Sequence, residues 1–113
     1  MHELSITKMM LDLVLEEAET NEASRVERIC LVVGEMSGIV DDCVRFYFDL
    51  LSQNTIAEGA EIRFRSVPAT ARCRECGKEF KLKGCAWGCP DCGRVNVEIA
   101  KGKELYVESI EVK

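Results

Sequence analysis

The 113-residue sequence has one histidine, one tryptophan and two prolines, and it lacks the motifs on which most enzyme active sites depend. It contains no combination of serine, histidine and aspartate that would build a nucleophilic triad, and no glycine-rich phosphate loop. Because His2 is the only imidazole, acid–base catalysis by histidine has a single candidate. The sequence therefore predicts a protein without enzymatic activity.

Long apolar runs are also absent. No stretch approaches the roughly 20 consecutive apolar residues that a membrane-spanning helix needs. Met1 leads directly into Glu3 and an amphipathic pattern, without the basic segment that begins a signal peptide. With 47% hydrophobic residues, the chain can form one domain, or a small domain with a smaller module. We therefore expect a cytoplasmic protein with a folded core.

The charges and the cysteines are unevenly distributed. Residues 1–60 hold four Lys or Arg against twelve Asp or Glu, whereas residues 61–94 hold eight against four. This basic middle segment also contains five of the seven cysteines. In a cytosolic protein, clustered cysteines more often bind metal than form disulfides. The segment is therefore predicted to be a metal-binding module within a more acidic protein.

Apolar periodicity predicts two helices and three strands. The first helix, at 4–20, has a stripe of apolar residues that is expected to face the core, with Met9 widening it: Ile6, Met10, Leu13, Val14 and Ala18. A second helix follows a loop with two glycines, and Asp41 or Asp42 is expected to be its N-cap. Strands are expected at 25–33, 60–67 and 103–112.

These elements predict an α+β fold. A strand–helix–strand order across 25–67 makes a right-handed crossover between parallel strands the default. The last strand is expected to pair antiparallel to its predecessor at 60–67. The predicted fold is a small mixed three-stranded sheet with two helices on one face. Residues 1–68 and 98–113 would form this α/β domain, and residues 69–97 an inserted cysteine module.

The inserted module carries two CxxCG knuckles, at 73–77 and 89–93. In each knuckle the chain turns so that both thiolates face one ion, and the glycine permits the tight turn. Four thiolates suit Zn²⁺ at a closed structural site, and these come from Cys73, Cys76, Cys89 and Cys92. The same pattern holds iron in rubredoxin-like sites, so zinc is favoured and iron stays an alternative. The spacing therefore predicts a zinc-ribbon-like module.

Other features of the module leave alternatives open. Cys85 is either a spare loop cysteine or a replacement ligand, and Trp87 is expected to pack over the site. The module also has basic side chains, which suggests a nucleic-acid or transcription-assembly module as an alternative function: Arg72, Arg74, Lys78, Lys81, Lys83 and Arg94. Nucleic-acid-binding modules depend on a wider basic field or on stacking aromatics, and here only Phe80 and Trp87 are present. Nucleic-acid binding is therefore the second hypothesis.

The amino terminus offers a second set of metal donors. The Met1 amine and the His2 backbone nitrogen form a five-membered chelate ring with one ion, and the His2 imidazole closes a six-membered ring with the same nitrogen. The Glu3 amide or carboxylate can supply a fourth donor. Planar sets rich in nitrogen suit Ni²⁺ and Cu²⁺, and binding through amide nitrogens releases protons. A histidine near a terminus is usually only solvated, so these donors alone leave both interpretations open.

Three features, taken in order, resemble the HypA family of nickel metallochaperones in [NiFe]-hydrogenase maturation: "MHELS" at the start, "VGEMSGI" after the first strand, and the CxxCG…CPxCG module before the last strand. The resemblance implies a nickel site of Met1, His2 and Glu3, and structural zinc on the four knuckle cysteines. It also implies a HypB-type GTPase as partner and the hydrogenase large subunit as recipient, and some members also serve urease. In some relatives histidines flank the zinc knuckles, and this sequence has none there. The resemblance therefore predicts a carrier of nickel. Because catalytic motifs and long apolar runs are absent, we expect this carrier to have no enzymatic activity and no membrane partner.

Overall fold

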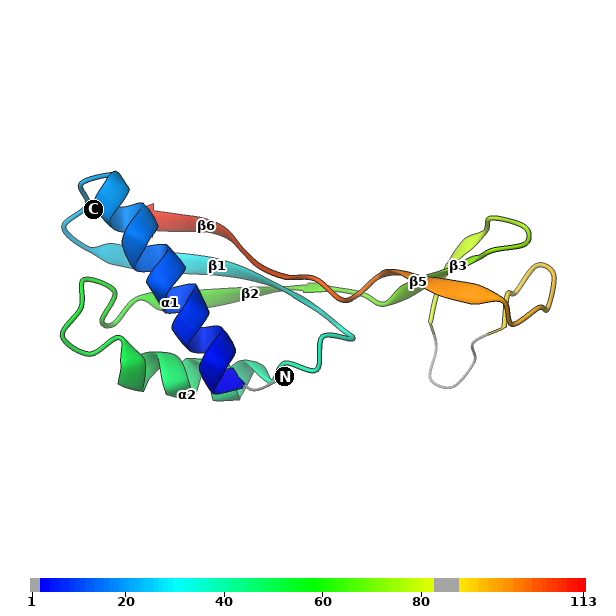
Figure 1. The fold of residues 1–113 in the computed structure, drawn as a ribbon, viewed down its shortest axis with the longest axis horizontal. Coiled ribbons are helices and arrows are strands. Elements are labelled where there is room, and N and C mark those ends of the chain that lie inside the picture. The colour runs from blue at the N-terminus through cyan, green and yellow to red at the C-terminus, as the bar shows by residue number, and fades with distance from the viewer. Residues whose placement is uncertain (1–2, 83–87) are drawn as a thin grey trace. The chain divides into compact units, whose positions relative to one another are not determined.

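The computed structural model describes residues 3–82 and 88–113, and contacts divide the chain into two compact units (Figure 1). The first unit is formed by the chain up to residue 32, by residues 38–65 and by residues 105–113. The second unit is formed by residues 33–37 and 66–104. That residues 69–97 fold as a separate module stays a prediction.

The first unit contains most of one three-stranded sheet and both helices. These elements are α1 (Glu3–Thr20), β1 (Val26–Gly34), α2 (Asp41–Leu51), β2 (Glu61–Val67) and β6 (Leu105–Val112). The strand order is β2-β1-β6, and the two helices lie on one face of the sheet (Figure 1). The predicted fold class is confirmed. Neither helix is long and apolar enough to cross a membrane.

The pairing of the last strand differs from the prediction. β6 pairs with β1 and not with its predecessor β2. The pair is antiparallel, because Lys113 exchanges backbone hydrogen bonds with Arg25 while the Gly34 N–H donates to the carbonyl of Glu104. β1 is the most apolar strand, with Ile29, Leu31 and Val32 buried. It therefore occupies the centre of the sheet, where both of its edges are paired with other strands.

The core of the first unit is formed by β1 and one side of each helix. On α1 the buried residues are Thr7, Met10, Leu11, Val14 and Ala18. Val44 and Phe48 of α2 are also buried. The prediction that Met9 and Leu13 belong to this core stripe is wrong, because their exposed fractions are 72% and 53%. They lie beside the buried stripe on the helix surface, and a periodic pattern alone does not separate buried apolar positions from the exposed ones next to them.

The start of α2 also differs from the prediction. Its N-cap is Val40, whose extended backbone has no side-chain hydrogen bond to the helix. Asp41 and Asp42 therefore lie inside the first turn instead of capping it. At that position their negative charges are favourable, because the first turn of a helix carries a partial positive charge.

The second unit contains a sheet of three short antiparallel strands, β3 (Thr70–Cys73), β4 (Glu79–Lys81) and β5 (Val97–Lys101). The strand order is β4-β3-β5, with Ala71 opposite Phe80 on one side and opposite Ile99 on the other. Ala71 is fully buried. These strands were not predicted from the sequence, because three to five residues are too few for an apolar period to be recognised.

The VGEMS segment (33–37) is hydrogen-bonded to two other segments of the second unit, one at Val67 and one at Gly102. The Glu35 N–H donates to the carbonyl of Val67, and the Met36 N–H donates to the carbonyl of Gly102. A Cβ at Gly34 would lie 2.2 Å from the Gly102 oxygen. The first glycine of this motif therefore permits a close approach of two backbone segments.

Candidate metal centre

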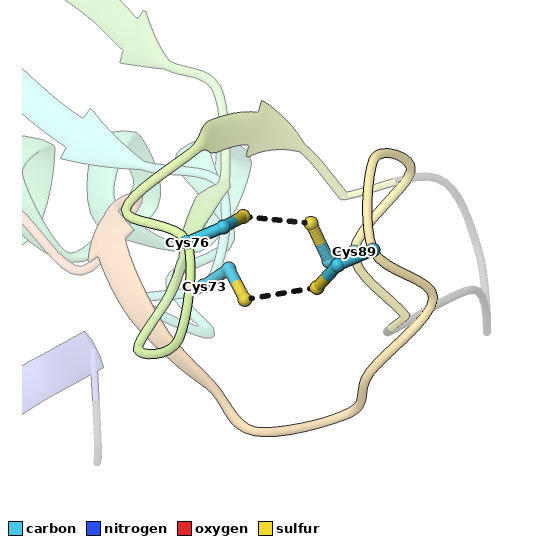
Figure 2. Close-up of side chains that lie close together, drawn as sticks. Cys73, Cys76 and Cys89 are labelled. Carbon is cyan, nitrogen blue, oxygen red and sulfur yellow. Dashed lines mark hydrogen bonds between the residues drawn. The ribbon is translucent and has the colours of Figure 1, made fainter.

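The four knuckle cysteines lie together in the second unit (Figure 2). The Sγ atoms of Cys73 and Cys92 are 3.6 Å apart, and those of Cys76 and Cys89 are 3.5 Å apart. All four sulfur atoms lie within 4.8 Å of one another. Cys73 and Cys89 are buried, whereas Cys76 and Cys92 are exposed. Each knuckle therefore contributes one buried and one exposed thiol to a single cluster.

The arrangement fits a tetrahedral Zn²⁺ site. Zn–S bonds of about 2.3 Å in a tetrahedron place the sulfur atoms roughly 3.8 Å apart. The observed distances of 3.5 and 3.6 Å, with all separations below 4.8 Å, bracket this value. Four thiolates also form a soft donor set that suits zinc or iron and does not suit Mg²⁺ or Ca²⁺. The donors and their spacing thus fit a structural zinc ion.

The two knuckles have the same backbone geometry. The Cys73 N–H donates to the Lys78 carbonyl, and the Gly77 N–H donates to the Cys73 carbonyl, at 2.9 Å each. In the second knuckle the corresponding bonds, from Cys89 to Arg94 and from Gly93 to Cys89, are both 2.8 Å. Gly77 and Gly93 have φ angles of +77° and +72°. Glycine is favoured at these positions because this left-handed backbone is strained for other residues.

The elements of the second sheet position the knuckles. Cys73 is the last residue of β3, and the first knuckle is the turn that leads into β4. The Arg74 N–H donates to the carbonyl of Asn96, just before β5 begins at Val97. The antiparallel pairs of β3 with β4 and with β5 therefore bring the two halves of the cluster to one end of the sheet.

The environment of the cluster changes the pKa values of its thiols in opposite directions. The backbone N–H of Cys76 lowers the pKa of Cys73, and the backbone N–H of Cys92 lowers the pKa of Cys89. For Cys92 the backbone N–H of Arg94 also lowers the pKa, but desolvation and the neighbouring thiols raise it to about 12. Four thiolates at this spacing need a cation among them, so metal binding must displace protons.

Ion pairs surround the cluster. Four of the basic side chains that suggested nucleic-acid binding face carboxylates in the pairs Arg72–Glu79 (3.3 Å), Arg74–Glu98 (3.5 Å), Lys78–Asp91 (3.5 Å) and Arg94–Glu75. Two of these pairs, Lys78–Asp91 and Arg94–Glu75, join one knuckle to the other. These pairs were not predicted from the sequence, where the basic residues suggested a nucleic-acid-binding module instead. Since these cations are paired, they do not form the open basic field that nucleic-acid binding needs.

Of the residues predicted to bind nickel, the structure describes Glu3. Met1 and His2 lie outside the described residues, as do Cys85 and Trp87. Glu3 begins α1, and its carboxylate accepts a hydrogen bond of 3.4 Å from the N–H of Val40. Its carbonyl accepts a hydrogen bond of 2.6 Å from the hydroxyl of the buried Thr7. Glu3 is therefore fixed at the start of α1 and beside the start of α2.

Comparison with known proteins confirms the family resemblance. A family model described as hydrogenase/urease nickel incorporation, metallochaperone, HypA matches residues 1–112. The hydrogenase maturation factor HypA of Caldanaerobacter subterraneus subsp. tengcongensis is 46% identical over 114 residues, which cover 100% of both chains. The factor of the same name from Nostoc sp. is 41% identical over 113 residues, which cover 100% of this chain and 96% of its own.

Solved structures show the same fold. A solution structure of HypA protein matches 99% of this chain and 96% of its own, with a TM-score of 0.78 at 24% identity. The solution structure of the Ni metallochaperone HypA from Helicobacter pylori has a TM-score of 0.69 at 24% identity and covers 99% of this chain and 97% of its own. The family match over residues 1–112 and relatives with up to 46% identity show that this chain belongs to the HypA family of nickel metallochaperones in hydrogenase maturation.

Proposed function

We propose that this chain binds Ni(II) at its amino terminus and delivers it, with a HypB-type GTPase, to the large subunit of [NiFe]-hydrogenase. The observation that carries this proposal is the distribution of metal donors. Within residues 3–82 and 88–113, the four knuckle cysteines are the only group of three or more metal-binding side chains that lie together. Because His2 is the only histidine, the amino terminus remains as the nitrogen-donor site for a second metal.

The proposed nickel ligands are Met1, His2 and Glu3. The terminal amine, the His2 backbone nitrogen and the His2 imidazole supply three nitrogens in adjacent chelate rings. The Glu3 amide is a suitable fourth donor, because amides in the first turn of a helix have no intrahelical acceptor. The Glu3 carboxylate already accepts a hydrogen bond from Val40. Protonation of these nitrogens would release the ion, so the site suits a cargo that must be passed on.

The proposed zinc ligands are Cys73, Cys76, Cys89 and Cys92. With four thiolates bound, zinc has no open position for water or substrate, which supports a structural and non-catalytic role. A bound zinc ion would supply a cross-link between the first knuckle and the second. Thiol ligands of this kind persist under reducing conditions, so we propose that the protein works in the cytoplasm.

Nickel titration of the untagged, zinc-loaded chain tests the cargo site. Isothermal calorimetry is expected to show one nickel site that is lost in His2→Ala and in a chain with one residue added before Met1. The matched control is Glu16→Ala, which removes an exposed carboxylate from the same helix and is expected to bind nickel like the parent. Equal nickel affinity in all four proteins would show that the terminal chelate is not the nickel site.

Metal analysis tests the zinc site separately. We expect one zinc ion per chain, and we expect Cys73→Ser to lose it while Cys43→Ser, on α2, retains it. Nickel binding should survive in Cys73→Ser, because the two sites use different residues. A visible-absorbing ferric centre in the purified protein would contradict the zinc assignment.

A further inference from the structure

Helix α1 carries a second apolar stripe outside the core. Ile6, Met9 and Leu13 follow one another at helical spacing, and we call them the outer stripe. Ile6 is half-buried, whereas Met9 and Leu13 are 72% and 53% exposed. Because single exposed apolar residues are common but a contiguous row is not, the outer stripe indicates a contact surface.

The outer stripe borders two hollows between α1 and β6. One hollow of about 560 Å³ is lined mainly by the outer stripe, Met10 and Leu105. A second hollow of about 440 Å³ continues along the helix, with Val107, Ile110 and Val112 of β6 on its other side. Leu13 borders both. We call the two together the α1–β6 groove, and among the described strands β6 is an edge of the first unit's sheet.

The charged residues of the groove are all acidic. They are Asp12, Glu16, Glu17 and Glu108, and no Lys or Arg lines either hollow among the described residues. Glu108 pairs with Arg65 on the sheet, at 2.5 Å. Within the part of the chain that the structure describes, Asp12 and Glu16 form no ion pair, although both are exposed. The groove therefore presents an apolar floor with unneutralised negative charge along its α1 side.

We propose that the α1–β6 groove binds an amphipathic helix of another protein, with an apolar face and flanking Lys or Arg residues. Apolar helix faces bind in such grooves through residues at spacings of three and four, and methionine adapts to the side chains it meets. From Ile6 to Asn21 the groove follows α1 for about 22 Å, which matches a helix of about 15 residues. The basic flanks would pair with Asp12 and Glu16.

The negative charge of the groove favours a basic helix over two other partners, which are a second copy of the chain and an anionic membrane. A second copy of the chain would bring two acidic grooves together, and like charges oppose that contact. An anionic membrane surface would be repelled for the same reason. The inference depends on α1 and β6 and not on nickel, although the partner would dock on the helix that begins at Glu3, next to the proposed cargo site.

Methyl NMR on the full, zinc-loaded chain tests the proposal. The probe, called the lysine peptide, is a synthetic helical peptide of about 15 residues with leucines on one face and lysines elsewhere. The control, called the glutamate peptide, has glutamate in place of every lysine. The chain has four methionines, so a methionine-methyl spectrum has few signals to assign. The lysine peptide is expected to shift the Met9 signal and leave that of Met36, in the second unit, unchanged. The glutamate peptide is expected to leave both unchanged.

Two exposed leucines provide the test variant and its control. Leu13→Lys places a like charge in the groove and is expected to weaken the lysine peptide at least about tenfold. Leu50→Lys, on α2 and 52% exposed, is expected to bind like the parent. Both variants should unfold at the parent's temperature, because neither leucine is buried. Nickel titration should be unchanged in Leu13→Lys, which separates this inference from the proposed function.

Several outcomes would overturn the inference. These are an unshifted Met9 signal, equal binding of the two peptides, and equal binding by Leu13→Lys and the parent. Sedimentation that shows self-association abolished by Leu13→Lys would assign the groove to a second copy instead. Co-sedimentation with phosphatidylglycerol vesicles, lost in the same variant, would assign it to a membrane.

Discussion

The left-handed backbone at Gly93, in the second knuckle, allows the effect of a substitution on zinc affinity to be predicted. Gly93 has a φ angle of +72°, and a Cβ at this position would have no neighbouring heavy atom within 4 Å. The cost of Gly93→Ala is therefore conformational and not steric, and it amounts to roughly 1–2 kcal/mol. If the knuckle adopts this backbone only when the metal is bound, the zinc dissociation constant rises about 5- to 30-fold.

Competition with a chromophoric zinc chelator measures this change, and two further variants make the reasoning specific. Gly93→Asn should recover part of the affinity, because asparagine tolerates the left-handed region better than alanine. Gly88→Ala is the matched control, since its Cβ would lie 3.8 Å from the Gly93 carbonyl oxygen, which is ordinary contact. The reasoning is refuted if Gly93→Ala binds zinc within a factor of two of the parent, or if Gly88→Ala weakens binding equally.

Two further predictions concern the second unit. Gly34→Ala would place a Cβ 2.2 Å from the Gly102 oxygen, so we expect a loss of about 3 kcal/mol or more in chemical unfolding. Gly38→Ala, with open space and a φ of +77°, should lose less, and a larger loss there would contradict the crowding argument. In the ion pair that joins the two knuckles, Lys78→Asp and Asp91→Lys should each lower the free energy of unfolding by up to about 1 kcal/mol, which is measured as a slightly lower melting temperature. The double swap should restore it, and additive losses would show that the pair does not interact.

Much of the first unit could be predicted from the sequence. The helix predicted at 4–20 is α1 (Glu3–Thr20), and the strand predicted at 60–67 is β2 (Glu61–Val67). These elements are long enough for apolar periodicity to repeat several times. The cysteine cluster was predictable for a different reason, because a CxxCG knuckle is a local structure and two of them need one shared metal.

The remaining features depend on contacts between segments that are distant in the sequence. Leu13 and Val14 both belong to the predicted apolar stripe of the first helix, but only Val14 is buried, and the packing of α1 against the rest of the first unit decides this. The pairing of β6 with β1 likewise does not follow the order of the strands along the chain, because the strand with the most buried apolar residues takes the centre of the sheet. Gly34 and Gly102 are far apart in the chain, so their close contact could not be predicted from either part of the sequence alone.

X-ray absorption at the zinc and nickel edges of one doubly loaded sample tests whether the two metals occupy separate sites with different donors. We expect four sulfur neighbours at about 2.3 Å around zinc, from the cluster whose sulfurs lie within 4.8 Å of one another. Around nickel we expect nitrogen and oxygen neighbours, including an imidazole, and no thiolate sulfur. Thiolate sulfur at nickel, or an imidazole missing from it, would contradict the claim that the two metals occupy separate sites with different donors.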